Sequence, residues 1–337
     1  MTTKRTLRAL QFSLLLLFLC ALCASSPLSS AQDSSLPKRP KILGIASVRI
    51  LVPVDRASDS RDFYSRLFPL DHPCIWCGEP RRITFSINES QFIELTQSPL
   101  PLPSNLIAEI TLSTDDLPAM RRFLVAHSIP VEKPVLGLEV DPALLAYAPT
   151  TEKLQSGQTS TEPDVHIQVS DPEGHRIGFV QSYPPAQTES SGRLAKRLIH
   201  AGFAVKDREA EDKFYKDLLG FRLYWHGGMN DGETDWMDMQ VPEGTDWIEY
   251  MLNVPQNAGK KVLGVMNHIA IGVYDIEAAN FGAKKSGMAV REEPQIGRDG
   301  KWQLNLYDPD GTRVEYMEFT PVEKPCCSEY TGPHPKP

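Results

Sequence analysis

The sequence lacks the features that mark nucleic-acid-binding proteins and multi-span membrane proteins. Its 337 residues carry a formal net charge of −8, and no basic tract interrupts the chain, which argues against a nucleic acid as partner. Beyond the N-terminal segment, no apolar run reaches the roughly 20 residues that a membrane helix needs. With 41% hydrophobic and 23% charged residues, the composition is that of a globular chain with room for about two domains. We therefore expect a small molecule as partner; the oligomeric state is open.

Cysteine is also scarce, with six in the chain. Two of them, Cys20 and Cys23, lie in an apolar N-terminal segment. The other four form a Cys-x-x-Cys and an adjacent pair: Cys74, Cys77, Cys326 and Cys327. In an oxidising compartment these four allow three disulfide pairings. We expect structural disulfides, one arrangement joining the C-terminal tail to the first domain. A redox-active pair and a zinc knuckle are the alternatives.

The N-terminal segment has the pattern of a secretory signal peptide. Basic residues at positions 4, 5 and 8 precede an apolar run over 12–23, and small residues at 29–31 offer a cleavage site. The apolar run is short for a membrane span. We expect residues 1–31 to be removed and the protein to be exported, periplasmic or secreted, without a stable membrane span. An uncleaved anchor is the alternative.

The apolar pattern divides residues 44–320 into four similar units, each a strand, a helix and further strands. The expected helices span 58–68, 117–127, 209–219 and 276–285. A polar stretch rich in Pro, Ser and Gly at 184–192 separates a first domain (44–183) from a second (193–320), and a Pro-rich tail (321–337) follows. One unit alone leaves its sheet half covered. We therefore expect an α+β fold in which units pair edge to edge, two pairs in all, around a cavity.

The last two units form an internal repeat that carries chemistry. His200 and His268 each lie seven residues before an Asp, at the start of a strand-like run. Each unit then ends in an apolar run with one Glu: Glu249 lies 49 residues after His200, and Glu315 lies 47 after His268. Imidazole and carboxylate are ligands of divalent metals. Two neutral imidazoles and two carboxylates balance a divalent cation and leave coordination positions open for substrate.

Strand alternation supports this ligand set, because alternate residues share a face. Gly202 and Ala204 share the face of His200, and Ala270 and Gly272 share that of His268. The bulky neighbours point the other way, toward the expected helices. Small residues beside both histidines would leave space for a metal and its ligand. The set suits one Zn, Ni, Mn, Fe(II) or Co ion, and the sequence does not choose among them.

The second domain resembles the vicinal oxygen chelate superfamily, which includes glyoxalases, bleomycin-resistance proteins and extradiol dioxygenases. The motifs in the family's order are Leu198-Ile199-His200, Phe214-Tyr215-x-x-Leu218-Leu219-Gly220, Ile248-Glu249, Asn267-His268-Ile269-Ala270 and Asp308-Pro309-Asp310-Gly311-x-x-x-Glu315. The resemblance is weaker over 44–183. It implies four βαβββ modules paired into two glyoxalase-like domains, with a metal held by both modules of a pair.

The first domain departs from the pattern. In the second domain an Asp lies seven residues after each His, and aligning the corresponding Asp residues of the first domain gives the equivalent positions. They are Val48 or Arg49 for the first His, Glu94 for the first Glu, Glu109 for the second His and Gly178 for the second Glu. Acidic residues without an imidazole make a poor site of this kind. We expect residues 44–183 to form a degenerate domain without metal.

Three functions fit the second domain. In a glyoxalase-type lyase or isomerase, Glu249 and Glu315 would be catalytic and shuttle a proton between adjacent carbons. In an extradiol-type dioxygenase, Fe(II) would be held by His200, His268 and Glu315 alone. A binding or resistance protein without catalysis would not need four ligands. The glyoxalase type is favoured because both modules carry a Glu.

Aromatic side chains in the second domain are candidates for the substrate pocket, since such walls suit apolar ligands. They are Trp225, Trp236, Tyr250 and Trp302. Ordinary packing is the alternative for each.

Overall fold

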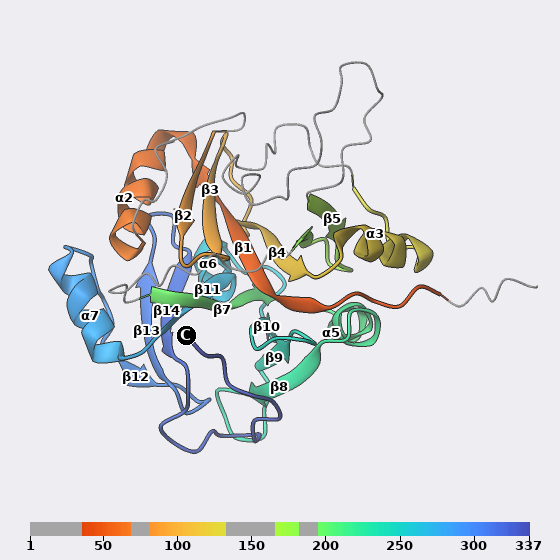
Figure 1. Ribbon diagram of the computed structural model, residues 1–337. Coiled ribbons are helices and arrows are strands. Elements are labelled where there is room, and N and C mark those ends of the chain that lie inside the picture. The colour runs from red at the N-terminus through yellow and green to blue at the C-terminus, as the bar shows by residue number, and fades with distance from the viewer. Residues whose placement is uncertain (1–35, 69–80, 133–165, 182–194) are drawn as a thin grey trace, which may run out of the picture. The chain divides into compact units, whose positions relative to one another are not determined.

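The structure, a computed structural model, describes residues 36–68, 81–132, 166–181 and 195–337 (Figure 1). The predicted signal peptide, Cys74, Cys77 and the predicted linker at 184–192 lie outside the described residues. Among the described residues, no helix combines the length and apolarity needed to cross a membrane.

The first half of the chain forms a six-stranded sheet with the order β2-β3-β1-β4-β6-β5. Its central strands β1 and β4 are antiparallel. The elements are β1 (Ile42–Pro53), a 3-10 turn (Val54–Arg56), α2 (Ala57–Leu67), β2 (Arg82–Ser86), β3 (Phe92–Ser98), β4 (Ile107–Thr114), α3 (Leu117–Ala126), β5 (His166–Ser170) and β6 (Arg176–Gln181).

The second half forms an eight-stranded sheet with the order β12-β13-β14-β11-β7-β10-β9-β8. Here β7 and β11 are the antiparallel central pair. The elements are β7 (Ala195–Ala204), α5 (Arg208–Asp212), a π-helical segment η2 (Lys213–Leu218), β8 (Arg222–Gly227), β9 (Trp236–Gln240), β10 (Trp247–Met251), α6 (Lys260–Met266), β11 (His268–Val273), α7 (Ile276–Lys285), β12 (Gln295–Ile296), β13 (Trp302–Tyr307) and β14 (Arg313–Glu318).

The expected α+β fold with two curled sheets is confirmed. In both sheets the first strands of two units pair antiparallel at the centre, which is the expected edge-to-edge pairing. Helix α7 matches its predicted range, and Asp275 caps its N-terminus by accepting from Ala278 N. The two sheets use residues 42–181 and 195–318, on either side of the predicted linker.

Two details differ from the expectation. The helix expected over 209–219 is a short α-helix continued by the π-helical segment η2. Helix α6 is not among the helices expected from the sequence. Its N-cap is Gly259, which has no side-chain cap, and Gly264 lies inside the helix. Glycine is a poor helix former, so the sequence carried no helix signal here.

The faces of the eight-stranded sheet differ as strand alternation predicts. Ile248 and Tyr250 belong to the main core, where Tyr250 packs on Phe203 and Tyr215 with ring centroids 6.2 and 5.9 Å apart. Trp247 belongs to a second, smaller cluster. This other, inner face holds the site described below.

The C-terminal tail has neither helix nor strand, as expected, yet it is bound to the sheet. Thr331 N donates to Tyr224 O at 3.0 Å, and Gln240 Nε2 donates to Pro333 O at 3.0 Å. Cys326 and Cys327 are disulfide-bonded to each other. This bond belongs to one of the three pairings that the sequence left open. The arrangement that joins the tail to the first domain is not the one formed, because each of these cysteines has the other as its partner.

Candidate metal centre

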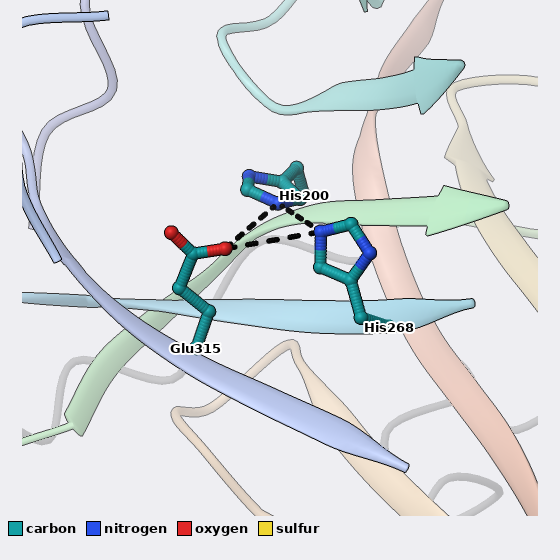
Figure 2. Close-up of side chains that lie close together, drawn as sticks. All are labelled: His200, His268 and Glu315. Carbon is teal, nitrogen blue, oxygen red and sulfur yellow. Dashed lines mark hydrogen bonds and ion pairs between the residues drawn. The ribbon is translucent and has the colours of Figure 1, made fainter. Parts of the chain in front are cut away.

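The four predicted ligands come from four neighbouring strands of the eight-stranded sheet: β14, β11, β7 and β10. Strand register brings them together. Gly202 on β7 lies opposite both Glu249 on β10 and His268 on β11. Ala270 on β11 lies opposite both His200 and Glu315. The four side chains therefore alternate with small residues on the inner face, and Figure 2 shows three of them, His200, His268 and Glu315.

The ligand atoms converge. His200 Nε2 and His268 Nε2 are 3.0 Å apart. Glu249 Oε2 lies 2.9 Å from His268 Nε2 and 3.6 Å from His200 Nε2. Glu315 Oε2 lies 3.8 and 3.9 Å from the same two nitrogens. These spacings fit ligands that share one ion at about 2.0–2.2 Å. Among the described residues, the ligand atoms of His200, His268 and Glu315 all lie within 4.8 Å of one another.

The tautomer of His268 also suits a metal. Its Nδ1 is 3.0 Å from Met266 O, so Nδ1 carries the proton and Nε2 keeps its lone pair for coordination. Among the described residues, His200 Nδ1 has no hydrogen-bond partner. The chemistry of the donor set therefore fits a divalent metal ion.

Burial sets the protonation of the site. It lowers the pKa of both His200 and His268 well below the usual range, so both imidazoles are neutral at pH 7. Burial also raises the pKa of Glu315 to about 8, against the opposing charge of Arg313 and with a contribution from Glu249. Buried carboxylates lack compensation from water, and a divalent cation would supply it.

The small residues on this face were expected to leave space for a metal and its ligand. Two of them instead make room for neighbouring side chains. A Cβ on Gly202 would lie 2.2 Å from Cε1 of His268, and a Cβ on Gly272 would lie 2.2 Å from the Phe319 ring. The missing side chain at Gly202 therefore makes room for the His268 ring itself.

The first sheet has the same register with different residues. Arg49 on β1 lies opposite both Glu94 and Glu109, as Gly202 lies opposite Glu249 and His268. Thr111 lies opposite Ser47 and Gly178, as Ala270 lies opposite His200 and Glu315. Glu94, Glu109 and Gly178 therefore hold the predicted positions. The expected equivalence of Val48 or Arg49 to the first His is wrong, because the residue at that register is Ser47.

Arg49 supplies positive charge between the carboxylates of the first sheet. Its guanidinium pairs with Glu94 and, at 2.7 Å, with Glu109. His166 Nε2 lies 2.5 Å from Glu109 Oε1, and Gln168 Nε2 donates to Glu109 Oε2 at 3.1 Å. The expectation that this half binds no metal stays a prediction.

The candidate pocket residues divide between the two faces. Trp225 and Trp236 pack with the inner cluster around Trp247, and Trp225 Nε1 donates to Cys326 O at 3.2 Å. Tyr250 and Trp302 pack against the main core instead. These two side chains therefore lie on the face away from the four ligands, because they alternate along their strands with Glu249 and with inner-face residues of β13.

Three inner-face residues escaped the sequence analysis. Trp247 is fully buried with its ring centroid 4.8 Å from that of His200, and it lies two residues before Glu249, a spacing that strand alternation could have used. Asp238 lies opposite Glu249, which requires knowledge of the register. Lys301 is fully buried, and nothing in the sequence distinguishes it from other lysines.

Known proteins resemble both the second half and the whole fold. The Glyoxalase/Bleomycin resistance protein/Dioxygenase superfamily matches residues 197–316. The mitochondrial methylmalonyl-CoA epimerase of Mus musculus is 32% identical over 154 residues, 41% of this chain and 83% of that protein. The probable chloroplastic lactoylglutathione lyase of Arabidopsis thaliana is 25% identical over 162 residues, 45% of this chain. The match spans about half, 46%, of that lyase.

Among solved structures, homoprotocatechuate 2,3-dioxygenase from Brevibacterium fuscum, in complex with 3,4-dihydroxyphenylacetate, matches with a TM-score of 0.56. The match covers 87% of this chain and 86% of that chain at 17% identity, so it concerns the fold. These names agree with the expectation of an enzyme that is either a lyase or isomerase or a dioxygenase. On the extent of the epimerase match and the matched domain, the chain belongs to the glyoxalase, bleomycin-resistance and dioxygenase superfamily, the vicinal oxygen chelate proteins.

Proposed function

We propose that this protein is a divalent-metal-dependent enzyme of glyoxalase type, a lyase or isomerase acting on a small substrate that chelates the metal through oxygen. The observation that carries the proposal is the approach of Glu249 Oε2 to 2.9 Å from His268 Nε2. It makes a donor set of two imidazoles and two carboxylates. The similarity to a lyase and an epimerase supports the same reading.

His200, Glu249, His268 and Glu315 would hold the ion, which would polarise two substrate oxygens and stabilise negative charge on them. The chain's own contribution is to exclude water and move a proton. His200, His268 and Glu315 are each at most 3% exposed. Glu249 is only partly buried, and we assign to its second carboxylate oxygen the task of taking a proton from one substrate carbon and returning it to the next.

An extradiol-type ring-cleaving dioxygenase using Fe(II) is the second candidate. Two observations favour it. The ligand atoms of His200, His268 and Glu315 lie within 4.8 Å of one another, and these residues are the ligand set of a two-His, one-carboxylate iron site. The fold is also similar over most of the chain. Glu249 has no assigned task in that reaction. A binding or resistance protein without catalysis is the third reading, and it would not need the four converging ligands.

Metal analysis of the purified protein, combined with Glu249→Gln, tests the proposal. We expect about one Zn, Ni, Mn or Co per chain and no catechol-dependent oxygen uptake. Proton transfer is followed by hydrogen–deuterium exchange into two probes, the hemithioacetal of glutathione with methylglyoxal and methylmalonyl-CoA. In Glu249→Gln the exchange should fall about 10²-fold or more and metal should remain.

Glu94→Gln is the matched control, since Glu94 has the same register in the first sheet, and its exchange rate should equal that of the unmodified protein. About one Fe per chain, with oxygen uptake that survives Glu249→Gln, would establish the dioxygenase instead. A protein that takes up no divalent metal would leave the binding protein.

We also propose that the protein is exported after removal of residues 1–31, on the basis of the N-terminal pattern. The mass of the mature protein tests this directly. We expect a chain that begins at Gln32, and an intact N-terminus on the exported protein would contradict cleavage at this site.

A further inference from the structure

Buried polar atoms with unused hydrogen-bonding capacity lie on the inner face beside the candidate metal centre. Among the described residues, the buried atoms there without a hydrogen-bond partner include Trp247 Nε1, Asp238 Oδ1, Lys301 Nζ and Asn305 Oδ1, in addition to His200 Nδ1 and Arg313 Nε beside the ligands. Asp238 lies opposite Glu249, and Asn305 lies opposite Glu315. Leaving a buried polar group unpaired costs about 1–3 kcal/mol. A ligand with its own oxygens would recover this free energy.

Lys301 stands out because its side chain is fully buried. Its Nζ lies 4.6 Å from the ring centroid of Trp247, 5.1 Å from that of Tyr330 and 5.3 Å from that of Tyr224. The faces of aromatic rings stabilise an ammonium ion. They do not satisfy its three N–H donors in the way oxygen acceptors do. Burial lowers the pKa of Lys301, and the charges of nearby carboxylates, Asp299 first, oppose that shift. Among the described residues, the Lys301 amine has no hydrogen-bond partner.

Pairing with a neighbouring carboxylate does not satisfy the N–H donors of Lys301. Among the described residues, the nearest carboxylate oxygen to Lys301 Nζ is Asp299 Oδ2, at 4.0 Å, which is beyond hydrogen-bond distance. Asp299 also has other partners. Tyr330 donates to its carbonyl oxygen at 2.7 Å and to its Oδ2 at 3.2 Å. Tyr330 comes from the C-terminal tail, so the tail completes the aromatic surroundings of Lys301.

One indole links Lys301 to the metal centre. Trp247 contacts Lys301 through its ring and also lies 4.8 Å, centroid to centroid, from the ring of His200. A small ligand that reached from the ion past Trp247 would meet the unpaired Nε1–H donor of Trp247 and the ammonium of Lys301. Both are donors, and one carries a positive charge.

We propose that Lys301 is a specificity-determining residue that binds an anionic group of the substrate, a carboxylate or a phosphate, located away from the two oxygens that chelate the metal. This inference rests on the proposed metal-dependent function and names its substrate class: a small anion with two vicinal oxygens and a separate acidic group. Trp247 Nε1 donates to the same group. Asp238 and Asn305 provide acceptors for a substrate hydroxyl.

Three hydroxamates, each chelating a metal through two vicinal oxygens, test this on the metal-loaded full chain. Acetohydroxamate has no further charge, succinate monohydroxamate adds a carboxylate, and phosphonoacetohydroxamate adds a phosphonate. By titration calorimetry we expect at least one acidic hydroxamate to bind about tenfold or more tightly than acetohydroxamate. The better of the two identifies the acidic group.

In Lys301→Met this preference should fall to within about twofold, with acetohydroxamate affinity and metal content unchanged. Lys301→Arg should keep most of it. Trp247→Phe, which keeps an aromatic ring but removes the donor, should lose about threefold. A preference that survives Lys301→Met, or an equal loss for all three hydroxamates, would overturn the inference while leaving the metal centre intact. If no hydroxamate bound the metal-loaded protein, the proposed function would fall, and this inference with it.

Discussion

The two sheets have the same strand register but carry different side chains at the equivalent positions. In the second sheet the register positions hold imidazoles and carboxylates, whereas the first sheet has an arginine between two carboxylates. The equivalent pairs are His200 and Ser47, Glu249 and Glu94, His268 and Glu109, Glu315 and Gly178, and Gly202 and Arg49. The first sheet thus carries its own cation, and the second carries ligands for one.

This exchange accounts for the different roles we assign to the halves. The guanidinium of Arg49 always carries its charge and offers no coordination position. It satisfies Glu109, whose side chain is fully buried, by direct pairing. The second sheet has glycine at the same register, so a ring from His268 fills the space. A metal there would keep positions open for substrate, which a built-in arginine cannot do.

The largest expected effect separates the halves by metal content. His268→Ala should abolish stoichiometric metal binding while the protein still folds, because it removes a ligand at the centre of the four-strand cluster. Elemental analysis after gel filtration, with circular dichroism to check folding, measures this. Glu109→Gln, at the same register in the first sheet, should retain the full metal content. Metal retained by His268→Ala, or lost from Glu109→Gln, would contradict the assignment.

Removing the built-in cation should destabilise the first sheet without affecting the metal. Arg49→Met leaves Glu94 with Arg82, 3.6 Å away, and leaves the buried Glu109 with His166 and Gln168 but without its guanidinium partner. Breaking a buried ion pair costs about 3–5 kcal/mol in the free energy of unfolding, and we expect a loss toward the lower end of that range because these partners remain. Urea unfolding measures the loss. Adding Glu109→Gln to Arg49→Met should restore part of it, since the uncompensated charge is gone. If the single variant were as stable as the unmodified protein, the ion-pair account would be wrong.

Filling the space at Gly202 should weaken the metal site without touching a ligand. In Gly202→Ala the new Cβ would overlap the His268 ring, so the ring must move. We expect metal affinity to fall about 10–100-fold, as when a ligand loses its support. Competition with a chromogenic chelator measures it. Gly259→Ala is the control, because a Cβ there has no neighbour within 4 Å among the described residues. Equal affinities in the two variants would refute the packing role.

The candidate ligands could be predicted because each of the two repeated units carries one His and one Glu at matching positions. Each His lies seven residues before an Asp, each Glu follows its His at nearly the same distance, and strand alternation puts them on one face. The first-domain alignment failed at one position for a physical reason. The Asp used for the alignment is not equivalent in the two halves. Asp207 and Asp275 are the N-cap residues of their helices, whereas Asp55 lies inside the 3-10 turn Val54–Arg56 and the N-cap of α2 is Arg56.

Lys301 could not be predicted from the sequence. Its aromatic neighbours are contributed by residues 224, 247 and 330, which only the curvature of the sheet and the path of the tail bring together. From its sequence, the tail could be predicted only as an irregular Pro-rich segment. Its hydrogen bonds to β8 and β9 do not produce a periodic pattern of apolar residues. The surroundings of Lys301 and the attachment of the tail both depend on tertiary contacts between segments that are distant in the sequence.

The comparison of the halves extends to the helices. In each half a helix Tyr donates to the Asp of a turn from the other half: Tyr64 to Asp308 at 3.2 Å, and Tyr215 to Asp171 at 3.1 Å. The residue four positions before this Tyr differs between the two halves. Ser60 donates to Asp310 Oδ2 at 3.3 Å, whereas Glu211 faces Asp171. Burial, and then the charge of Asp171, raise the pKa of Glu211 to about 9.

The smallest expected effect follows from this difference. An unfolded Glu ionises near pH 4.5, but folded Glu211 keeps its proton to about pH 9, so the free energy of unfolding falls as pH rises between these values. Glu211→Gln retains a donor toward Asp171 without a titrating group. It should stabilise the protein by about 1–2 kcal/mol at pH 8, after discounting for solvent screening, and by nothing at pH 4.5. Urea unfolding at both pH values measures this, with Ser60→Ala as the control whose effect should not vary with pH. A pH-independent effect of Glu211→Gln would mean that Glu211 is ionised in the folded protein.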